Sequence, residues 1–279
     1  MTISGYFFLR FITFTATMAV FIILVVALAF IYFIWRPKPR NPEEFPNAWT
    51  KPLQANVSFY RHLDDEQKAS FREKMMHFLA GIKITGVHTA VEELDKILIA
   101  ASAVIPIFGF DDWEYAHIEE VLLYPTTFNH GFQFDDQAED KQILGMVGSG
   151  MLRGKMILSR NALRNGFQNH TDKHNTAIHE FVHLLDKEDG DIDGIPQVLL
   201  EHQYTIPWLD LIHRKMEEIN NDTSDIRNYG GTSKVEFLTV ASEYFFERPD
   251  LMRRKHPDLY EMLVKCFRQE PKYKAKRKK

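Results

Sequence analysis

Cysteine is almost absent from this sequence of 279 residues, in which Cys266 is the single example. One cysteine cannot form a disulfide within the chain, and it excludes every zinc site that is built on several thiolates. Any metal site must therefore consist of histidine and carboxylate side chains. The sequence also lacks an internal repeat and a glycine-rich phosphate-binding loop, which argues against a repeat architecture and against a P-loop enzyme.

Acidic residues are absent from both ends of the chain. Residues 1–40 contain four basic side chains and no acidic one, and residues 271–279 contain six basic side chains and no acidic one. Residues 41–270 therefore hold 24 basic against 38 acidic side chains, a formal charge of −14. Because binding to phosphates needs a basic face, this acidic body argues against nucleic acid as the main partner.

Charge is also absent from residues 11–35, which are rich in Phe, Ile, Leu, Val and Ala. At about 1.5 Å per residue, a helix of this length spans a hydrocarbon layer of roughly 30 Å. A cleaved signal peptide has an apolar region of only about 7–15 residues, followed by small residues. This run is longer and ends in a tryptophan and a basic stretch. We therefore predict a transmembrane helix at residues 11–35, after a short N-terminal segment at residues 1–10.

The flanks of this helix indicate its orientation. Three basic residues, Arg36, Lys38 and Arg40, follow the helix, whereas Arg10 and the amino terminus precede it. The positive-inside rule then places residues 36–279 on the cytoplasmic side of the membrane. The single cysteine agrees with a reducing compartment.

Proline is concentrated directly after the predicted helix. Five prolines between positions 37 and 52 predict an extended, semi-rigid linker at residues 36–56. At the other end of the chain, residues 271–279 form a basic tail with two readings. The tail is either attracted to anionic cytoplasmic lipid or is a solvated, disordered chain end.

Residues 57–270 show no second shift in composition and are predicted to fold as one α+β domain. Apolar residues recur at helical spacing from Phe71 to Ile82 and from Val91 to Ile105. Two short β-rich runs follow, Glu120–Tyr124 and Lys155–Ser159, each bounded by turn residues.

The chemistry is indicated by the motif HEFVH at residues 179–183. On a helix, His179 and His183 lie on one face, so both imidazoles can reach one zinc ion. Glu180 then lies beside the metal, where it can act as general base towards a zinc-bound water. Asp186 follows on the same face, where it can hold a ligating imidazole in position or simply end the helix.

A catalytic zinc takes three protein ligands and leaves one position open. The helical segment 230–247 is the best source of the third ligand, because Glu236 and Glu243 lie seven residues apart on nearly the same face. Glu236 forms a capping box with Ser233 and so has a structural role. Glu243 stands among apolar residues, where an unpaired carboxylate is costly. We therefore predict Glu243 as the third ligand.

Three further features have two readings each. Tyr229 precedes the same segment and either stabilises the oxyanion of a tetrahedral intermediate or packs in a turn. The acidic loop at residues 189–194 suggests calcium but lacks the twelve-residue ligand spacing with a terminal glutamate, so one zinc ion per chain is the predicted cofactor. The strand at residues 155–159 either pairs with an extended peptide or is an ordinary strand of the sheet.

Together, these motifs resemble the Mlc titration factor A family of zinc-dependent peptidases. The resemblance is strongest at residues 177–196, where HExxH and Asp186 are followed by D-x-D-G-x-P from Asp191 to Pro196. Further short matches are Phe59-Tyr60-x-x-Leu63, Leu98–Ala101, Tyr124-Pro125-x-x-Phe128, Ile157–Ser159 and Val240–Phe246. The resemblance covers about residues 43–270.

This resemblance implies a zincin-like α+β fold of the gluzincin type, similar to the catalytic domain of anthrax lethal factor. It implies zinc bound by His179, His183 and Glu243. It also implies Glu180 as general base and an aminopeptidase-like or other peptidase activity. The best-known members are soluble bacterial proteins that bind a glucose-responsive transcriptional repressor, so a regulatory protein partner is implied as well.

Two features depart from the pattern of this family. The N-terminal membrane helix is outside the familiar soluble pattern. Family members can also carry an upstream histidine that is able to cap the metal, but residues 135–154 contain no histidine, and His130 is the nearest candidate.

The sequence therefore supports a membrane-anchored, cytoplasm-facing zinc peptidase that acts on a peptide or protein substrate by general-base activation of a zinc-bound water. The alternative is a zinc-stabilised regulatory binding protein that sequesters a transcriptional regulator and has little catalytic activity. A third reading treats the helix at residues 174–187 as ordinary core with two incidental histidines. Glu180 favours the enzyme, because a purely structural site needs no general base there.

Overall fold

The computed structural model describes residues 18, 21–28, 30, 41–126, 145–147, 154–169, 171–196, 199–200 and 202–271. The chain divides into two units, Met1–Arg40 and Asn41–Lys279. Residues 18, 21–28 and 30 of the predicted membrane helix are helical and exposed. The rest of that helix lies outside the described residues, as do the N-terminal segment at residues 1–10 and all but the first residue of the basic tail. None of the described helices has both the length and the apolar character that a bilayer crossing needs.

Four strands form one sheet in the order β1-β2-β4-β3. β1 (Lys83–Gly86), β2 (Glu120–Tyr124) and β4 (Lys155–Ser159) are parallel, and β3 (Gly145–Val147) pairs antiparallel with β4. The two strands predicted from the sequence, β2 and β4, have the predicted bounds. Since β4 has a partner strand on both sides, it offers no free edge to a peptide. The β-augmentation reading of this strand is wrong, and β4 is an ordinary interior strand.

Helices make up most of the remaining described chain. In chain order they are η1 (Asn47–Trp49), α2 (Thr50–Asn56), α3 (Ser58–His62), α4 (Asp65–Gly81), α5 (Glu93–Ile107), α6 (Arg160–Gln168), α7 (Thr176–Asp186), η3 (Lys187–Asp189), η4 (His202–Tyr204), α8 (Thr205–Asn220), η5 (Asn228–Gly231), α9 (Lys234–Glu247), α10 (Pro249–Lys255) and α11 (Pro257–Phe267). The two helical patterns predicted before the first β-rich run correspond to α4 and α5.

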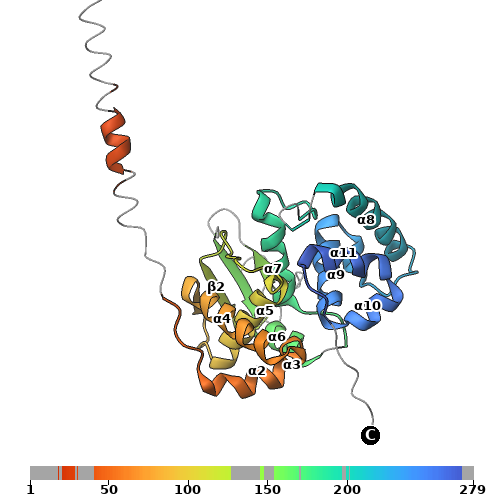
Figure 1. Ribbon diagram of the computed structural model, residues 1–279, viewed down its shortest axis with the longest axis horizontal. Coiled ribbons are helices and arrows are strands. Elements are labelled where there is room, and N and C mark those ends of the chain that lie inside the picture. Colours follow the sequence, from red (N-terminus) through yellow and green to blue (C-terminus); the bar gives the residue numbers. More distant parts are fainter. Residues whose placement is uncertain are drawn as a thin grey trace, which may run out of the picture. The chain divides into compact units, whose positions relative to one another are not determined.

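Helix α5 forms the centre of the core, because every residue from Ile97 to Ile107 is buried. It packs against α4 and α7, and α7 packs in turn against α9. In Figure 1, α7 therefore lies between the part of the domain that holds the sheet, α4 and α5 and the part that is formed by α8 to α11. This packing brings the helix that carries the HEFVH motif alongside the helix that carries the two candidate glutamates.

The second half of the predicted linker at residues 36–56 is part of the folded domain. It forms η1 and α2, and both Trp49 and Leu53 are buried in the core. Pro46 is the residue before η1, and Pro52 lies in the first turn of α2. At these positions proline is compatible with a helix, because its missing N–H would have no partner within the helix. The proline content therefore does not indicate an extended spacer here.

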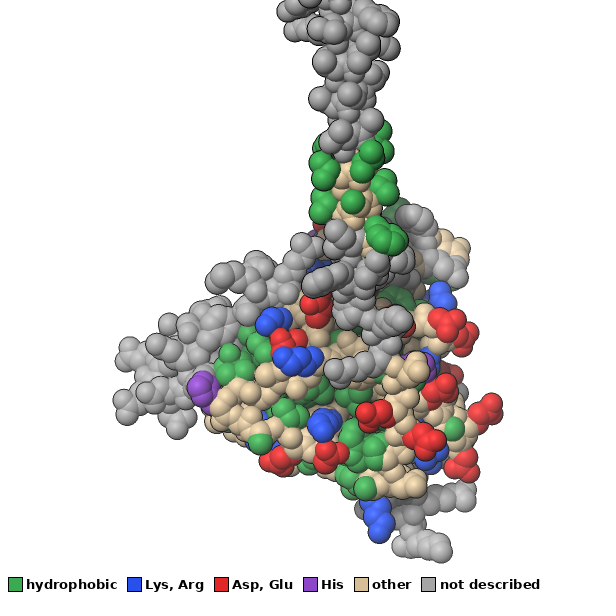
Figure 2. Space-filling model, turned by 90° about the vertical axis from the view of Figure 1, so that its left-hand side faces the viewer, with side chains coloured by type: hydrophobic (Ala, Val, Ile, Leu, Met, Phe, Trp, Pro, Cys, Tyr) green, Lys and Arg blue, Asp and Glu red, His purple; other side chains and the backbone are tan. Residues whose placement is uncertain are grey.

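Charged side chains of both signs are mixed on the face of the protein that Figure 2 shows. Acidic and basic side chains lie next to one another there, with apolar side chains between them. The described part of this face has no extended region of a single charge sign.

Candidate metal centre

Helix α7 is fixed in position by its cap and by one aromatic residue of the motif. The helix begins after Asn175, whose side-chain oxygen accepts the N–H of Ile178 at 3.2 Å. Phe181 is fully buried, and its ring centroid lies 5.5 Å from that of Phe78 and 5.3 Å from that of Tyr115. These contacts hold the apolar face of α7 against the core and turn the histidine face towards α9. A Phe181→Ala substitution would cost about 3–5 kcal/mol of stability.

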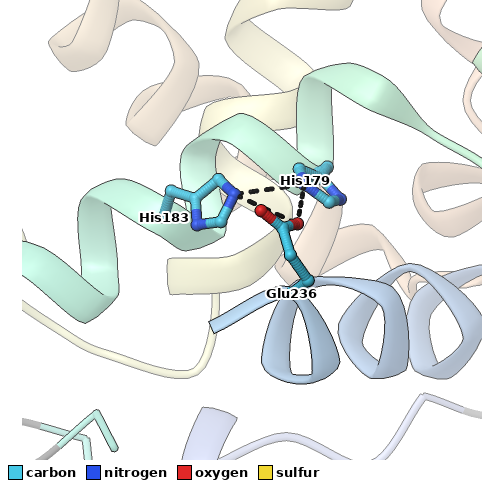
Figure 3. Close-up of side chains that lie close together, drawn as sticks. All are labelled: His179, His183 and Glu236. Carbon is cyan, nitrogen blue, oxygen red and sulfur yellow. Dashed lines mark hydrogen bonds and ion pairs between the residues drawn. The ribbon is translucent and has the colours of Figure 1, made fainter. Parts of the chain in front are cut away.

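The side chains of His179, His183 and Glu236 converge between α7 and α9 (Figure 3). Oε2 of Glu236 lies 3.1 Å from Nε2 of His179 and 3.7 Å from Nε2 of His183. The two Nε2 atoms are 3.1 Å apart. Within the described ranges, this is the one group of at least three His, Cys, Asp or Glu side chains whose ligand atoms all lie within 4.8 Å of one another. The acidic loop at residues 189–194 contributes none of its members.

The electrostatics of this cluster favour a positive charge at its centre. Burial alone would lower the pKa of His179, but its contacts with Glu236 and Glu243 raise the pKa to about 10. Burial and the charge of His179 together lower the pKa of His183 to about 4. A carboxylate only accepts hydrogen bonds, so Nδ1 of His179 donates to Glu243, and Nε2 of the protonated ring donates to Glu236. A bound cation would replace the proton on Nε2, while Glu243 would keep the proton on Nδ1. Nε2 of His179 and Oε2 of Glu236, at 3.1 Å, need a proton or a cation between them, and two imidazoles with one carboxylate are a donor set that suits zinc.

Glu243, the predicted third ligand, lies outside this cluster, on the opposite side of the His179 ring. Its Oε1 is 2.8 Å from Nδ1 of His179 and also accepts from the guanidinium of Arg227, while its Oε2 accepts the N–H of Asn175. Burial would raise the pKa of Glu243, but its contacts with His179 and Arg227 hold it below its usual value. The buried charge that favoured Glu243 as a ligand is therefore compensated by three protein groups.

Glu236, which the sequence analysis assigned to a capping box, lies in the cluster instead. Its backbone N–H donates to Oγ of Ser233 at 3.1 Å, so Ser233 caps α9 as predicted. The carboxylate of Glu236, however, points to the two histidines (Figure 3). The seven-residue spacing placed Glu236 and Glu243 on one face of α9, but it carried no information on which ring nitrogen each carboxylate approaches.

Tyr229 and Glu180 both lie beside the cluster. The ring of Tyr229 stacks on that of His179, with a centroid distance of 6.0 Å and an interplanar angle of 29°, and its hydroxyl hydrogen-bonds to Glu236. Burial and the charge of Glu236 raise the pKa of Tyr229 to about 12, so the hydroxyl keeps its proton at neutral pH. The side chain is 50% exposed, whereas Glu180, next to His179 on α7, is 5% exposed.

Asp186 holds neither imidazole of the cluster: Glu243 pairs with Nδ1 of His179, and Nδ1 of His183 and Oδ1 of Asp186 each have no hydrogen-bond partner among the described residues. Oδ2 of Asp186 accepts the N–H of Gly194 at 2.9 Å, and burial raises the pKa of Asp186 to about 7. Gly194 has φ +76°, and a Cβ added there would lie 2.4 Å from the carbonyl oxygen of Lys234. Asp186 thus fixes the loop after α7 against the first turn of α9, two residues before Glu236.

One residue of this site was missed by the sequence analysis, and another cannot be placed. Arg227 contacts Glu243 but belongs to no motif and has no informative spacing, so the sequence offers no signal for it. His130, the nearest upstream histidine, lies outside the described residues.

Two histidines four residues apart on one helix, a glutamate between them and a carboxylate from a second helix form the arrangement of a metallopeptidase centre. Together with the α+β domain, this centre defines the class of the protein as metallopeptidase. Residues 33–268 match the family described as glucose-regulated metallo-peptidase M90, and the chain belongs to this family.

The chain is also similar to individual bacterial proteins. It is 27% identical over 245 residues to the Mlc titration factor A of Pectobacterium atrosepticum, an alignment that covers 85% of this chain and 89% of the relative. It is 31% identical over 196 residues to that of Escherichia fergusonii, with 64% and 71% covered. An uncharacterised protein of Synechocystis sp. is 26% identical over 268 residues, with 90% and 97% covered. The resemblance to the Mlc titration factor A family, inferred from the motifs, is confirmed.

Proposed function

We propose that the protein is a zinc-dependent peptidase of the HExxH…E gluzincin type. The observation that carries this proposal is the convergence of His179, His183 and Glu236, whose ligand atoms lie within 4.8 Å of one another. We assign these three side chains as the zinc ligands, with Glu236 in the place that the sequence analysis gave to Glu243. Three protein ligands leave one position open, as a catalytic zinc requires.

The residues around the ligands have complementary roles in peptide hydrolysis. Zinc, when bound, lowers the pKa of a water molecule and polarises the substrate carbonyl. Glu180 takes the proton from the attacking water and delivers it to the leaving nitrogen. Tyr229 keeps its phenolic proton at neutral pH and donates a hydrogen bond to the oxyanion of the tetrahedral intermediate. Its half-exposed position supports contact with an incoming peptide.

The experiment uses the full chain in detergent. Zinc content per chain is measured together with hydrolysis of a mixed peptide library, for the wild type and for Glu180→Gln. We expect one zinc in both proteins and loss of cleavage in the variant, because the amide cannot accept the proton. Glu217→Gln, at an exposed carboxylate of α8, is the matched control and keeps full activity. A wild type without zinc, or a Glu180→Gln variant with full cleavage, contradicts the proposal.

We also propose that residues 11–35 anchor the enzyme in the cytoplasmic membrane, with residues 36–279 on the cytoplasmic side. The uncharged length of this segment and the three basic residues after it support the anchor. The full chain is expected in the membrane fraction after washing with salt and carbonate, and a chain that starts at Asn41 in the soluble fraction. Protease added to intact spheroplasts should leave the catalytic domain uncut. Cutting of the domain there would contradict the orientation, and a soluble full chain would contradict the anchor.

A regulatory binding role is the second candidate function. It is supported by the relatives named Mlc titration factor A, since that name describes the titration of a protein called Mlc. In this role the metal centre would stabilise a surface that sequesters a transcriptional regulator. Glu180→Gln distinguishes the two functions, because it abolishes peptide cleavage and leaves capture of a regulator unchanged.

A further inference from the structure

Glu243 is held by three groups from two segments, α7 with its N-cap residue and the loop that carries Arg227. Oε1 lies 2.8 Å from Nδ1 of His179 and accepts from Nη2 of Arg227, and Oε2 accepts the N–H of Asn175 at the start of α7. Glu243 is fully buried, and the side chain of Arg227 is 26% exposed. Arg227 is the one side chain of this set that carries a permanent positive charge.

The segment that carries Arg227 is rigidly anchored on both sides. Asp225 accepts from Nζ of Lys173 at 2.8 Å, from the hydroxyl of Tyr244 at 2.9 Å and from Nε2 of His256 at 2.7 Å. After Arg227, Gly230 is buried and packs on α9, where an added Cβ would lie 3.2 Å from the side chain of Val240. Three parts of the fold therefore hold the backbone around Arg227: the loop before α7, α9, and the residue after α10.

The same short segment reaches two of the three carboxylates of α9, Glu243 and Glu236. Arg227 contacts Glu243, and Tyr229, two residues later, hydrogen-bonds to Glu236 and stacks on His179. The His179 ring thus has a carboxylate at each nitrogen and an aromatic ring against its face, and each of these groups is contacted by, or belongs to, residues 227–229. Orientation of this ring decides where its Nε2 lone pair points.

We propose that Arg227 is a positioning residue of the metal centre, which acts through Glu243 to hold the Nε2 lone pair of His179 towards the metal position. The inference rests on the proposed function, because it assumes that a metal binds at this cluster. Without Arg227, Oε1 of Glu243 keeps only the contact with His179, and the buried carboxylate loses its charged partner. The carboxylate and the imidazole that it orients can then rotate out of line with His183 and Glu236.

The test measures metal affinity of the full chain in detergent, by competition of Zn²⁺ with a chelator of known affinity. Arg227→Met removes the donor and keeps most of the side-chain volume. We expect its affinity for Zn²⁺ to fall by about 10–100-fold, the usual effect of losing an outer-shell partner. Arg227→Lys keeps a charged donor for the single Nη2 contact, and we expect it to recover most of this loss. Arg248→Met is the control, because Arg248 contacts the carbonyl of Thr171 at 3.4 Å and no residue of the cluster.

Two further measurements separate positioning from a general loss of stability. The visible spectrum of the Co²⁺ form reports coordination geometry and should change in Arg227→Met but not in Arg248→Met. In a Glu243→Gln background, Arg227→Met should have almost no further effect on Zn²⁺ affinity, because Arg227 acts through that carboxylate. If Arg227→Met does not fold, Arg227→Gln replaces it, since its shorter amide does not reach Glu243, and the same loss is expected.

The outcomes are distinguishable. Weakened Zn²⁺ binding in Arg227→Met, recovery in Arg227→Lys and no effect in the control support the inference. If Arg227→Met binds Zn²⁺ as tightly as the wild type, or if Arg248→Met weakens binding equally, the inference is overturned and the proposed function stands. A wild type that binds neither Zn²⁺ nor Co²⁺ overturns both.

Discussion

Glu243 and Glu236 approach opposite nitrogens of the same imidazole, that of His179. Oε1 of Glu243 lies 2.8 Å from Nδ1, and Oε2 of Glu236 lies 3.1 Å from Nε2. The two glutamates are seven residues apart on α9, which is about two helical turns. Their carboxylates therefore reach the ring from its two ends. Only Glu236 also approaches His183, at 3.7 Å from its Nε2. The two carboxylates therefore have different surroundings, one at the candidate metal position between the two histidines and one behind the His179 ring.

This relationship predicts a fixed order of effects on metal binding. Glu236→Ala removes a ligand and is expected to weaken Zn²⁺ binding by more than about 100-fold, whereas Glu243→Gln keeps an acceptor for Nδ1 and should weaken it by about 10–100-fold. Isothermal titration of Zn²⁺ into the metal-free protein measures both. Glu261→Gln, an exposed carboxylate of α11, serves as the control. A larger loss in Glu243→Gln than in Glu236→Ala would restore Glu243 as the ligand.

The sequence predicted the elements of the site better than their contacts. Periodicity located α4 and α5, β-rich composition and turn residues gave β2 and β4 their bounds, and the HEFVH motif placed His179 and His183 on one helix face. The sequence analysis chose Glu243 over Glu236, whereas the structure brings the side chain of Glu236 to both histidines. The capping argument used the backbone N–H of Glu236, which leaves its side chain unassigned. A buried carboxylate can pair with a metal ion, an imidazole, a guanidinium or a backbone N–H. The sequence analysis considered only the metal ion as the partner of Glu243.

Two further differences between the sequence predictions and the structure also arise from tertiary contacts. Residues 47–56 were assigned to a linker from their prolines, but Trp49 and Leu53 bury their side chains in the core. The sequence gives no signal for Arg227, because its contact with Glu243 forms only when the loop before η5 packs against α9. Neither the burial of Trp49 and Leu53 nor the contact of Arg227 can be predicted from local composition.

Tyr229 is expected to contribute to the chemical step rather than to substrate binding. Tyr229→Phe removes the hydroxyl and keeps the ring against His179, so kcat should fall by roughly 10²–10³-fold, as for loss of one oxyanion donor, with KM nearly unchanged. Steady-state kinetics on one cleaved peptide measure both constants. Tyr204→Phe, outside the metal cluster and packed against Lys265, should leave them as in the wild type. A rise in KM with unchanged kcat would instead assign Tyr229 to substrate binding.

Asp225 is expected to stabilise the fold in a pH-dependent manner. Burial alone would raise its pKa, but bonds from Lys173, His256 and Lys255 hold it well below the ordinary value of 3.8. A depressed pKa contributes stability above the unfolded value, and this contribution is lost as the pH falls below about 4. Asp225→Asn should therefore reduce the free energy of unfolding by roughly 1–3 kcal/mol at pH 7, and the difference from the wild type should shrink in acid.

Urea unfolding at several pH values between 3 and 8 measures this effect. Asp222→Asn is the matched control, because Asp222 is exposed and close in sequence, and its φ of +55° is one that asparagine tolerates. A constant difference between Asp225→Asn and the wild type from pH 7 down to pH 3 would show that the charge of Asp225 does not stabilise the fold.

Glu247 is expected to have the opposite dependence on pH. Burial, together with the charge of Glu243, raises the pKa of Glu247 from 4.5 to about 9, so the folded protein binds a proton that the unfolded chain releases near pH 4.5. A raised pKa contributes stability at low pH, and this contribution is lost as the pH rises from 4.5 to 9. Glu247→Gln imitates the protonated form at every pH. We therefore expect the zinc-free variant to match the wild type near pH 4.5 and to be more stable by roughly 1–3 kcal/mol at pH 8. Urea unfolding in the presence of a chelator tests this, and a variant less stable than the wild type at pH 8 would mean that the fold uses the ionised carboxylate.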